Sequence, residues 1–147
     1  YCKVQTMNTE AINNKALAQK FYDYLQNEDY ESAAQLCHED FIFYLQLDTP
    51  IHGTDGFIVS EKANFDAFNG FKFTVEKMFA EDNHVAVFMV FDGSHSAKLM
   101  GIEPTGNRVR FSLMMLLQIK DGKILEKRAH FDKADILRQL TPLPAVS

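Results

Sequence analysis

The chain has 147 residues, a length typical of one domain that buries roughly two thirds of its unfolded surface. Its net charge of -5, without a cluster of basic residues, excludes the positive surface that nucleic-acid binding requires. No apolar run approaches the roughly 20 residues that span a bilayer, and no signal segment is visible, so we expect a cytoplasmic protein without a membrane partner. The 13 Phe and 5 Tyr, with no Trp, predict a thick core, a cavity walled by rings, or both.

The first part of the chain has helical spacing. From Asn13 to Gln26 apolar residues recur every three or four positions, which predicts a helix with one buried face. Asp29 has the character of an N-cap for a second short helix, which we expect to include Cys37. The two cysteines have no framework spacing, so we interpret Cys37 as a free buried thiol.

A strand and a third helix follow. Residues 41–47 are rich in aromatic and β-branched side chains, which predicts a strand, and residues 49–53 form its exit loop. Thr54 and Asp55 precede a helical pattern that contains several Phe side chains and one glutamate. Asn69-Gly70 is typical of a stop and a turn.

After Gly70 the period changes to that of strands. Asp121-Gly122 is a strong signal for a two-residue hairpin, and Asp92-Gly93 favours a bulge. A last helix contains Ile136 and Leu140. The expected strands run from residue 71 to a turn at 82–83, from 84 to 95, from 109 to 119 and from 124 to 132.

Helices followed by antiparallel strands indicate the α+β class, with helices packed on one face of a curved sheet. We expect residues 1–10 to be a disordered tail or an appended remnant, residues 11–140 to form one domain, and residues 141–147 to be a C-terminal tail.

Three segments carry a resemblance to a known family. They read GSHSAKLMGIEPTG at residues 93–106, DGKILEKRAHFD at 121–132 and ILRQL at 136–140. In this order and spacing they resemble the SnoaL-like polyketide cyclases, in particular the ester cyclase branch of the nuclear-transport-factor-2-like (NTF2-like) superfamily. The resemblance implies a cone: a curved antiparallel sheet, about three N-terminal helices packed on it, and a short C-terminal helix.

The resemblance also implies a site. In cyclases of this kind an acidic residue near the end of the last strand is the acid/base group of an intramolecular aldol ring closure, and Asp132 matches that position. Removing a proton next to a carbonyl requires a carboxylate or imidazole in a dry pocket. We therefore expect Asp132 to be the base, with His95 or His130 as proton donor.

Arg128 stands where the family usually has Trp, which favours a different and anionic ligand. We expect Arg128 to bind the oxyanion or a carboxylate, and Phe111 and Tyr44 to contact the substrate. In a strand, residues 126, 128, 130 and 132 share one face. That row is equally typical of a solvated strand face, and Asp132 of a helix cap.

The function that these features favour is acid/base catalysis, as in aldol-type cyclisation or isomerisation, on a small apolar carbonyl compound. The sequence contains no phosphate-binding loop and no metal-ligand spacing, so we expect no cofactor and no metal. A non-catalytic ligand-binding or dimerisation module is the alternative, because this fold is widely reused. The resemblance further implies a homodimer formed through the outer face of the sheet.

Overall fold

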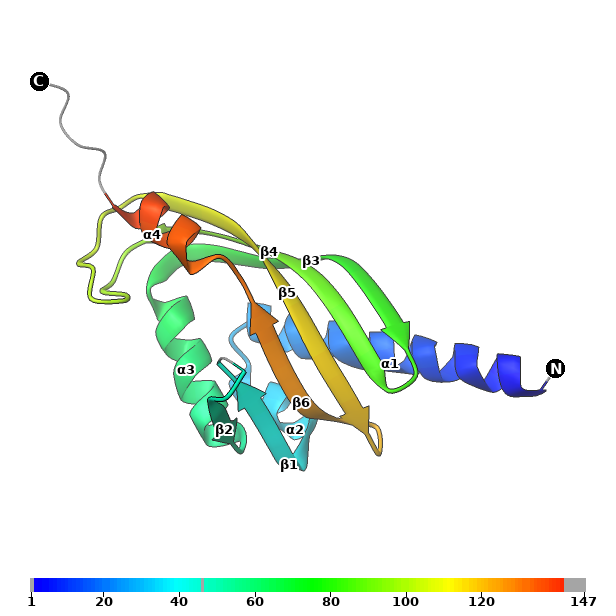
Figure 1. Ribbon diagram of the computed structural model, residues 1–147. Helices are drawn as coiled ribbons and strands as arrows, with labels where there is room; N and C mark the ends of the chain where they lie inside the picture. The colour runs from blue at the N-terminus through cyan, green and yellow to red at the C-terminus, as the bar shows by residue number, and fades with distance from the viewer. Residues whose placement is uncertain (1, 46, 142–147) are drawn as a thin grey trace, which may run out of the picture.

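The computed structural model describes residues 2–45 and 47–141, and within them it has the α+β architecture that the sequence predicts (Figure 1). The elements in chain order are α1 (Cys2–Gln26), α2 (Tyr30–Gln35), β1 (Cys37–Tyr44), β2 (Pro50–His52), α3 (Thr54–Asp66), β3 (Phe68–Glu81), β4 (His84–His95), β5 (Arg108–Lys120), β6 (Lys123–His130) and α4 (Lys133–Leu140).

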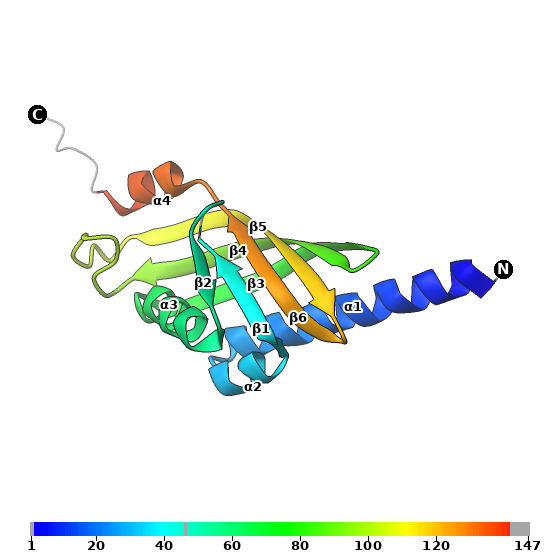
Figure 2. The same cartoon turned by 60° about the horizontal axis from the view of Figure 1, so that its bottom comes forward.

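The strands form one curved sheet in the order β2-β1-β6-β5-β4-β3. Neighbouring strands are antiparallel, except that β1 runs parallel to β6. Helices α1, α2 and α3 pack on one face of this sheet, and α4 lies beside β5 at the end of the sheet away from the N-terminus (Figures 1 and 2). The core therefore forms between the helices and the inner face of the sheet.

Helix α1 begins at Cys2 rather than at Asn13, so it includes residues that the sequence pattern left outside the domain. The physical reason is that no Gly or Pro, the residues that most strongly end helices, occurs before Pro50. None of the described helices has the length and apolar character that a membrane crossing demands. The tail expected at residues 141–147 lies outside the described residues, apart from Thr141.

The second helix is shorter than expected. Asp29 caps it as predicted, because its Oδ1 accepts a hydrogen bond from the Ser32 amide at 3.1 Å. Cys37, however, begins strand β1 and pairs with Ile124 of β6, so it is not helical. The expected loop at residues 49–53 contains a short edge strand, where Pro50 is tolerated since an edge leaves its nitrogen without a required partner.

The bulge expected at Asp92-Gly93 lies on the opposite strand. Between Asn69 and Lys72, β3 has one residue more than the β4 segment that pairs with it, and Gly70 there has a φ of +61°. The Asn69-Gly70 stop is thus part of β3. A Cβ atom at Gly93 would lie 2.9 Å from the Cβ of Phe68, so glycine allows the two strands to approach at this point.

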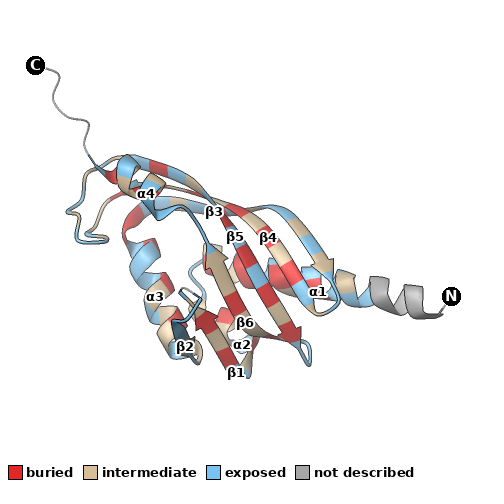
Figure 3. Ribbon diagram, viewed as in Figure 1, coloured by how far each residue is buried: buried red, intermediate tan, exposed pale blue. Residues whose placement is uncertain are grey.

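The alternation in β5 is present as predicted. Val109, Leu113, Met115, Leu117 and Ile119 are buried, and the residues between them are exposed or half-buried (Figure 3). The turn to β6 has positive φ angles at both central residues, 53° and 73°, which is the primed geometry that Asp-Gly favours.

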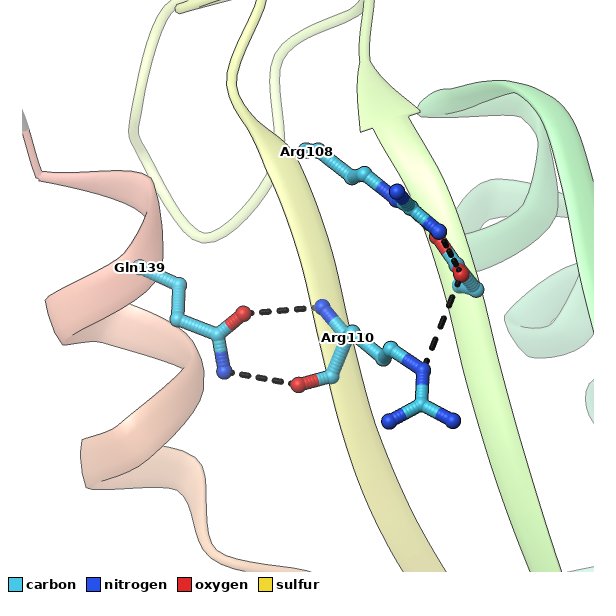
Figure 4. Close-up of polar contacts among 4 residues, drawn as sticks. Arg108, Arg110 and Gln139 are labelled. Atoms are coloured by element: carbon cyan, nitrogen blue, oxygen red, sulfur yellow. Dashed lines mark hydrogen bonds and ion pairs between the residues drawn. The ribbon is translucent and has the colours of Figure 1, made fainter.

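Helix α4 is attached to β5 by the side chain of Gln139. Strand β6 pairs with β5 only as far as Met114, so the backbone of β5 before that point lacks a strand on this side. The Gln139 amide replaces it: Nε2 donates to the Arg110 carbonyl at 2.8 Å, and Oε1 accepts from the Arg110 amide at 2.8 Å (Figure 4). The Asn107 side chain also donates to the Gln139 carbonyl at 3.1 Å. These bonds hold buried Ile136 against the core.

Replacing Gln139 with Ala should loosen α4, because two hydrogen bonds to the Arg110 backbone are lost. We expect the free energy of unfolding to fall by about 2 kcal/mol, at about 1 kcal/mol for each bond. Hydrogen exchange should show faster exchange of the Arg110 amide. Arg138→Ala, which removes an exposed ion pair in the same helix, is the control and should leave that amide protected. Unchanged exchange at Arg110 in the Gln139 variant would contradict this attachment.

Candidate functional site

A cavity of about 130 Å³ lies between α3 and the inner face of the sheet. One water molecule needs roughly 10–15 Å³ of such cavity volume, so the cavity has room for a small organic group. Its lining is mostly apolar and comes from α3, the sheet, the β4–β5 loop and α4. The lining residues are Phe43, Tyr44, Leu45, Ser60, Glu61, Asn64, Phe65, Phe68, Phe73, Phe91, Leu99, Met100, Phe111, Leu113, Met115, Lys127, Ala129, Phe131 and Ile136.

Phenylalanine rings form a continuous wall of the cavity. Phe65 and Phe91 lie nearly parallel, 6.1 Å apart at 4°, and Phe91 stacks on Phe111 at 5.3 Å. Phe111 then contacts Phe131 at 6.3 Å. Such a wall offers flat π surfaces, which favour offset stacking with an aromatic or alicyclic ligand.

The cavity opens between three segments. Leu45 after β1, Met100 in the β4–β5 loop and Phe131 after β6 all line it, yet each is 41–43% exposed. Side chains that contact both the cavity and the solvent mark its mouth. Asn64 of α3 also lines the cavity and is exposed, so this helix borders the mouth as well.

Two oppositely charged side chains face each other inside this apolar cavity. Lys127 Nζ lies 3.6 Å from Glu61 Oε1, and the two side chains are only 1% and 10% exposed. Nζ also lies 4.7 Å from the ring centre of Phe43 and 5.3 Å from that of Phe57. Apart from Tyr44, these are the titratable groups among the described lining residues.

The positions of both residues follow from their elements. Glu61 lies four residues from Phe57 and four from Phe65, so it shares the buried face of α3 with two rings. On β6, Leu125 is an extra residue relative to β5, because Ile119 pairs with Ile124 while Gln118 pairs with residue 126. This irregularity allows both Ile124 and Lys127 to point into the core.

Burial disfavours the charged form of each group. Desolvation raises the pKa of the Glu61 carboxyl above its usual 4.5, and the Lys127 ammonium opposes that rise. Desolvation likewise lowers the pKa of Lys127 below its usual 10.5, and Glu61 opposes that fall. Both changes bring the two pKa values closer to each other, so a proton moves between the groups more readily than it would in water.

The structure does not bring the predicted catalytic residues together at the cavity. Asp132 is exposed and is the N-cap of α4, where its Oδ1 accepts from the Asp135 amide at 3.1 Å. His130 is exposed at the end of β6. His95 is buried, and its Nδ1 accepts from the Thr105 amide at 3.2 Å. None of the three is a lining residue.

Two of the three predicted binding residues lie at the cavity. Phe111 and Tyr44 line the cavity, while Arg128 does not. The Arg128 guanidinium lies 3.8 Å from the ring centre of Tyr44, and its Nε donates to Glu126 at 2.6 Å. The substrate-binding roles of these residues stay predictions. Residues 126, 128 and 130 lie on the face of β6 that does not line this cavity. Alternation separates the two faces of a strand without telling which one is inside.

Sequence reasoning missed Glu61 and Lys127. A signal was available in both cases: each is a single charge within an apolar row. Glu61 interrupts the Phe row of the third helix, and Lys127 precedes Ala129 and Phe131 on the less polar face of the last strand. A charged side chain on the apolar face of a helix or strand is buried when that face packs on the core. Burying a charge without a partner costs free energy.

Other reactive groups lie outside the cavity lining. Cys37 is a free buried thiol as expected, and desolvation raises its pKa to about 12, so it is a poor nucleophile. In the described part of the chain, one group could place three ligand atoms on a metal, namely His38, Glu39 and Asp40. Its two carboxylates are exposed, and exposed acidic groups are common without an ion, so we assign no metal to it.

Comparisons with known proteins agree with this fold. A family model described as SnoaL-like polyketide cyclase matches residues 15–140. A SnoaL-like protein from Jannaschia sp. CCS1 superposes with a TM-score of 0.84 at 18% identity, over 91% of this chain and 95% of that one. AclR from Streptomyces galilaeus gives 0.81 at 24% identity, over 91% and 99%. An epoxide hydrolase of M. tuberculosis resembling LEH gives 0.70 at 19% identity, over 89% and 91%. Among curated proteins, none matches the sequence. These structures confirm the expected NTF2-like cone.

Replacing Lys127 with Met should destabilise the protein, because it leaves Glu61 buried without a partner. Breaking a buried pair costs about 3–5 kcal/mol near neutral pH. The pKa of Glu61 is raised in the folded state, so folding keeps a proton that the unfolded chain releases above its ordinary pKa of 4.5. The loss should therefore be small below that pH and grow as the pH rises.

Urea denaturation of the variant and the parent between pH 4 and 8 measures this dependence. The double variant Glu61→Gln/Lys127→Met is the matched control, because it contains no buried charge. We expect it to be about as stable as the parent, or more stable by about 1–4 kcal/mol. A loss in the single variant that does not depend on pH would contradict the ionisation of Glu61 as its cause.

Proposed function

Because the chain belongs to the SnoaL-like polyketide cyclase family, we propose that it is an enzyme that performs acid/base chemistry on a small apolar carbonyl compound. The observation that carries the proposal is the Glu61–Lys127 pair inside the apolar cavity. Aldol-type cyclisation and isomerisation both begin by removing a proton next to a carbonyl. A carboxylate in a dry pocket and an adjacent cation are the groups that this step needs.

The two groups take complementary roles. Glu61, as a carboxylate, accepts the proton from the carbon next to the carbonyl. Lys127, as an ammonium, donates a hydrogen bond to the carbonyl oxygen as negative charge develops there. Glu61 then returns the proton to the new hydroxyl in a cyclisation, or to a different carbon in an isomerisation. The low dielectric of the cavity strengthens both interactions relative to water.

The cavity lining favours an apolar ligand over an anionic one. Its ring wall supplies π surfaces, and Lys127 is the single cation among the described lining residues. Arg128, which the sequence pattern favoured as an anion partner, is occupied by Glu126 and the Tyr44 ring. An apolar ketone whose oxygen reaches Lys127 fits this distribution of groups.

A non-catalytic binding module is the competing function. An apolar pocket without convergent titratable groups would have favoured it. The cavity instead has an opposed acid and base, which a binding module does not need, since desolvating such a pair costs free energy without helping an apolar ligand bind. The pair therefore favours an enzyme.

We further propose that two copies of the chain associate through the outer face of the sheet, as the resemblance implies. Phe79, Ala86 and Leu116 are aligned side by side across β3, β4 and β5 by strand register, and Phe79 and Leu116 are 66% and 40% exposed. Exposed apolar patches of this kind mark interaction sites.

Leu116→Glu should convert this dimer to a monomer, because it places a charge in the apolar patch. Light scattering at micromolar concentration measures the mass of both forms. Val59→Glu changes an exposed apolar residue of α3, and this control should leave the mass unchanged. A monomeric parent protein would contradict the association.

Glu61→Gln should abolish most proton transfer, because an amide cannot accept the proton. The probe is 2-tetralone, a flat apolar ketone, and proton NMR in D₂O follows the exchange of its hydrogens next to the carbonyl. We expect the parent protein to accelerate exchange over buffer, and the variant to lose about 10²- to 10⁴-fold of that rate.

Variants of two further carboxylates are compared with Glu61→Gln in the same measurement. Asp55→Asn, an exposed change at the start of the same helix, is the matched control and should retain exchange. Asp132→Asn examines the role that the resemblance implies, and Asn preserves the helix cap. If Asp132→Asn stopped exchange while Glu61→Gln retained it, the base would be Asp132 and the assignment to Glu61 would be wrong.

A further inference from the structure

We propose that Lys127 is also a nucleophile, and that its amine forms a Schiff base with the carbonyl ligand of the cavity. This inference rests on the proposed function, since it requires a carbonyl compound to bind there. In this mechanism the neutral Lys127 amine attacks the carbonyl carbon instead of donating a hydrogen bond to the oxygen as an ammonium, and Glu61 keeps its acid/base role.

The surroundings of Nζ are those of an activated amine. The Lys127 side chain is 1% exposed, and the rings of Phe43 and Phe57 flank its nitrogen. In the described part of the chain, Glu61 is the carboxylate within ion-pair distance, and at 3.6 Å it lies beyond a well-formed hydrogen bond. Burial among these rings keeps the nitrogen away from bulk water. Desolvation in an apolar pocket is a recognised way to make lysine nucleophilic.

The nitrogen is also placed to react. Lys127 and Glu61 both line the cavity, so a carbonyl carbon that enters it meets the amine and the carboxyl together. Desolvation lowers the pKa of Lys127 and raises that of Glu61, so the neutral amine beside the neutral acid is more accessible here than in water. Cys37 does not compete as a nucleophile, because burial raises the pKa of its thiol to about 12 and keeps it protonated.

Lys127 and Glu61 together supply the protons that this step needs. The nitrogen lone pair attacks the carbonyl carbon, the π electrons move to oxygen, and that oxygen takes the Glu61 proton. The nitrogen then returns a proton to the Glu61 carboxylate, which passes it to the hydroxyl as the carbon–oxygen bond breaks. Water leaves with the carbonyl oxygen, one amine hydrogen and the Glu61 hydrogen. The products are a positively charged iminium and the Glu61 carboxylate.

The products of this step are the reactants for ring closure. An iminium acidifies the neighbouring carbon–hydrogen bond more than a ketone does, and the Glu61 carboxylate lies beside it to remove that proton. The resulting enamine attacks a second carbonyl within the same molecule and forms the new carbon–carbon bond. Water then hydrolyses the iminium, which releases the product and restores Lys127.

Reductive trapping tests the covalent step. Parent protein is incubated with 2-tetralone and sodium borohydride, and intact-mass spectrometry measures the adduct, whose mass is that of the ketone less one oxygen atom. Peptide mapping should place it on Lys127. Lys127→Arg keeps a cation without a nucleophilic amine, so we expect it to bind the ketone, seen by ligand NMR, and to give no adduct at this position.

Glu61→Gln/Lys127→Met serves as a second variant without an amine, with no unpaired buried charge to unfold it. Ketone binding and hydrogen exchange by the parent without an adduct on Lys127 would overturn the Schiff base and leave the proposed function intact. Exchange at the parental rate in Lys127→Arg would do the same. Absence of both binding and exchange would overturn the proposed function, and the Schiff base with it.

Discussion

The candidate site depends on one expensive interaction, the burial of an acid and a base in a cavity of aromatic rings. Removing Glu61 and Lys127 from water costs several kcal/mol per ion, and a contact of 3.6 Å between them recovers only part of that cost. Well-packed apolar residues would stabilise the fold as well or better. The pair is therefore poorly explained by stability, and well explained by chemistry that needs a proton donor and acceptor away from water.

The fold makes this arrangement possible through deviations from regular geometry. The extra residue at Leu125 lets Lys127 turn inward next to an already buried Ile124. Helix α3 holds Glu61 opposite, on the same face as its buried rings. At the far end, β6 stops short and Gln139 takes over its hydrogen bonds to β5, so that α4 contributes to the lining instead of another strand.

Periodicity and turn chemistry were enough to predict the architecture. The strict alternation before Ile119, the Asp121-Gly122 turn and the Asp29 cap are local features, and local physics decides them. Other features depended on tertiary contacts. Cys37 is part of a strand because it pairs with β6, and the irregularity near Gly70 arises where β3 pairs with β4. Neither contact is determined by residues that are close in the sequence.

The predicted site residues of β6 and the cavity lie on opposite faces of that strand for a related reason. Charged side chains on alternate positions are identical in pattern whether they face water or a polar pocket, and the polar row with Arg128 attracted attention because it contained more groups. The free-energy cost of desolvating a charge leads to the opposite inference about which face is informative. A row of charges is cheap on the surface and therefore uninformative, whereas a single charge in an apolar row must be desolvated to exist there. In a small domain rich in phenylalanine, the isolated charge is thus the better guide to a reactive site. The acid/base and covalent roles of Lys127 both follow from the same exclusion of water and differ only in whether the proton rests on nitrogen or on the Glu61 carboxyl.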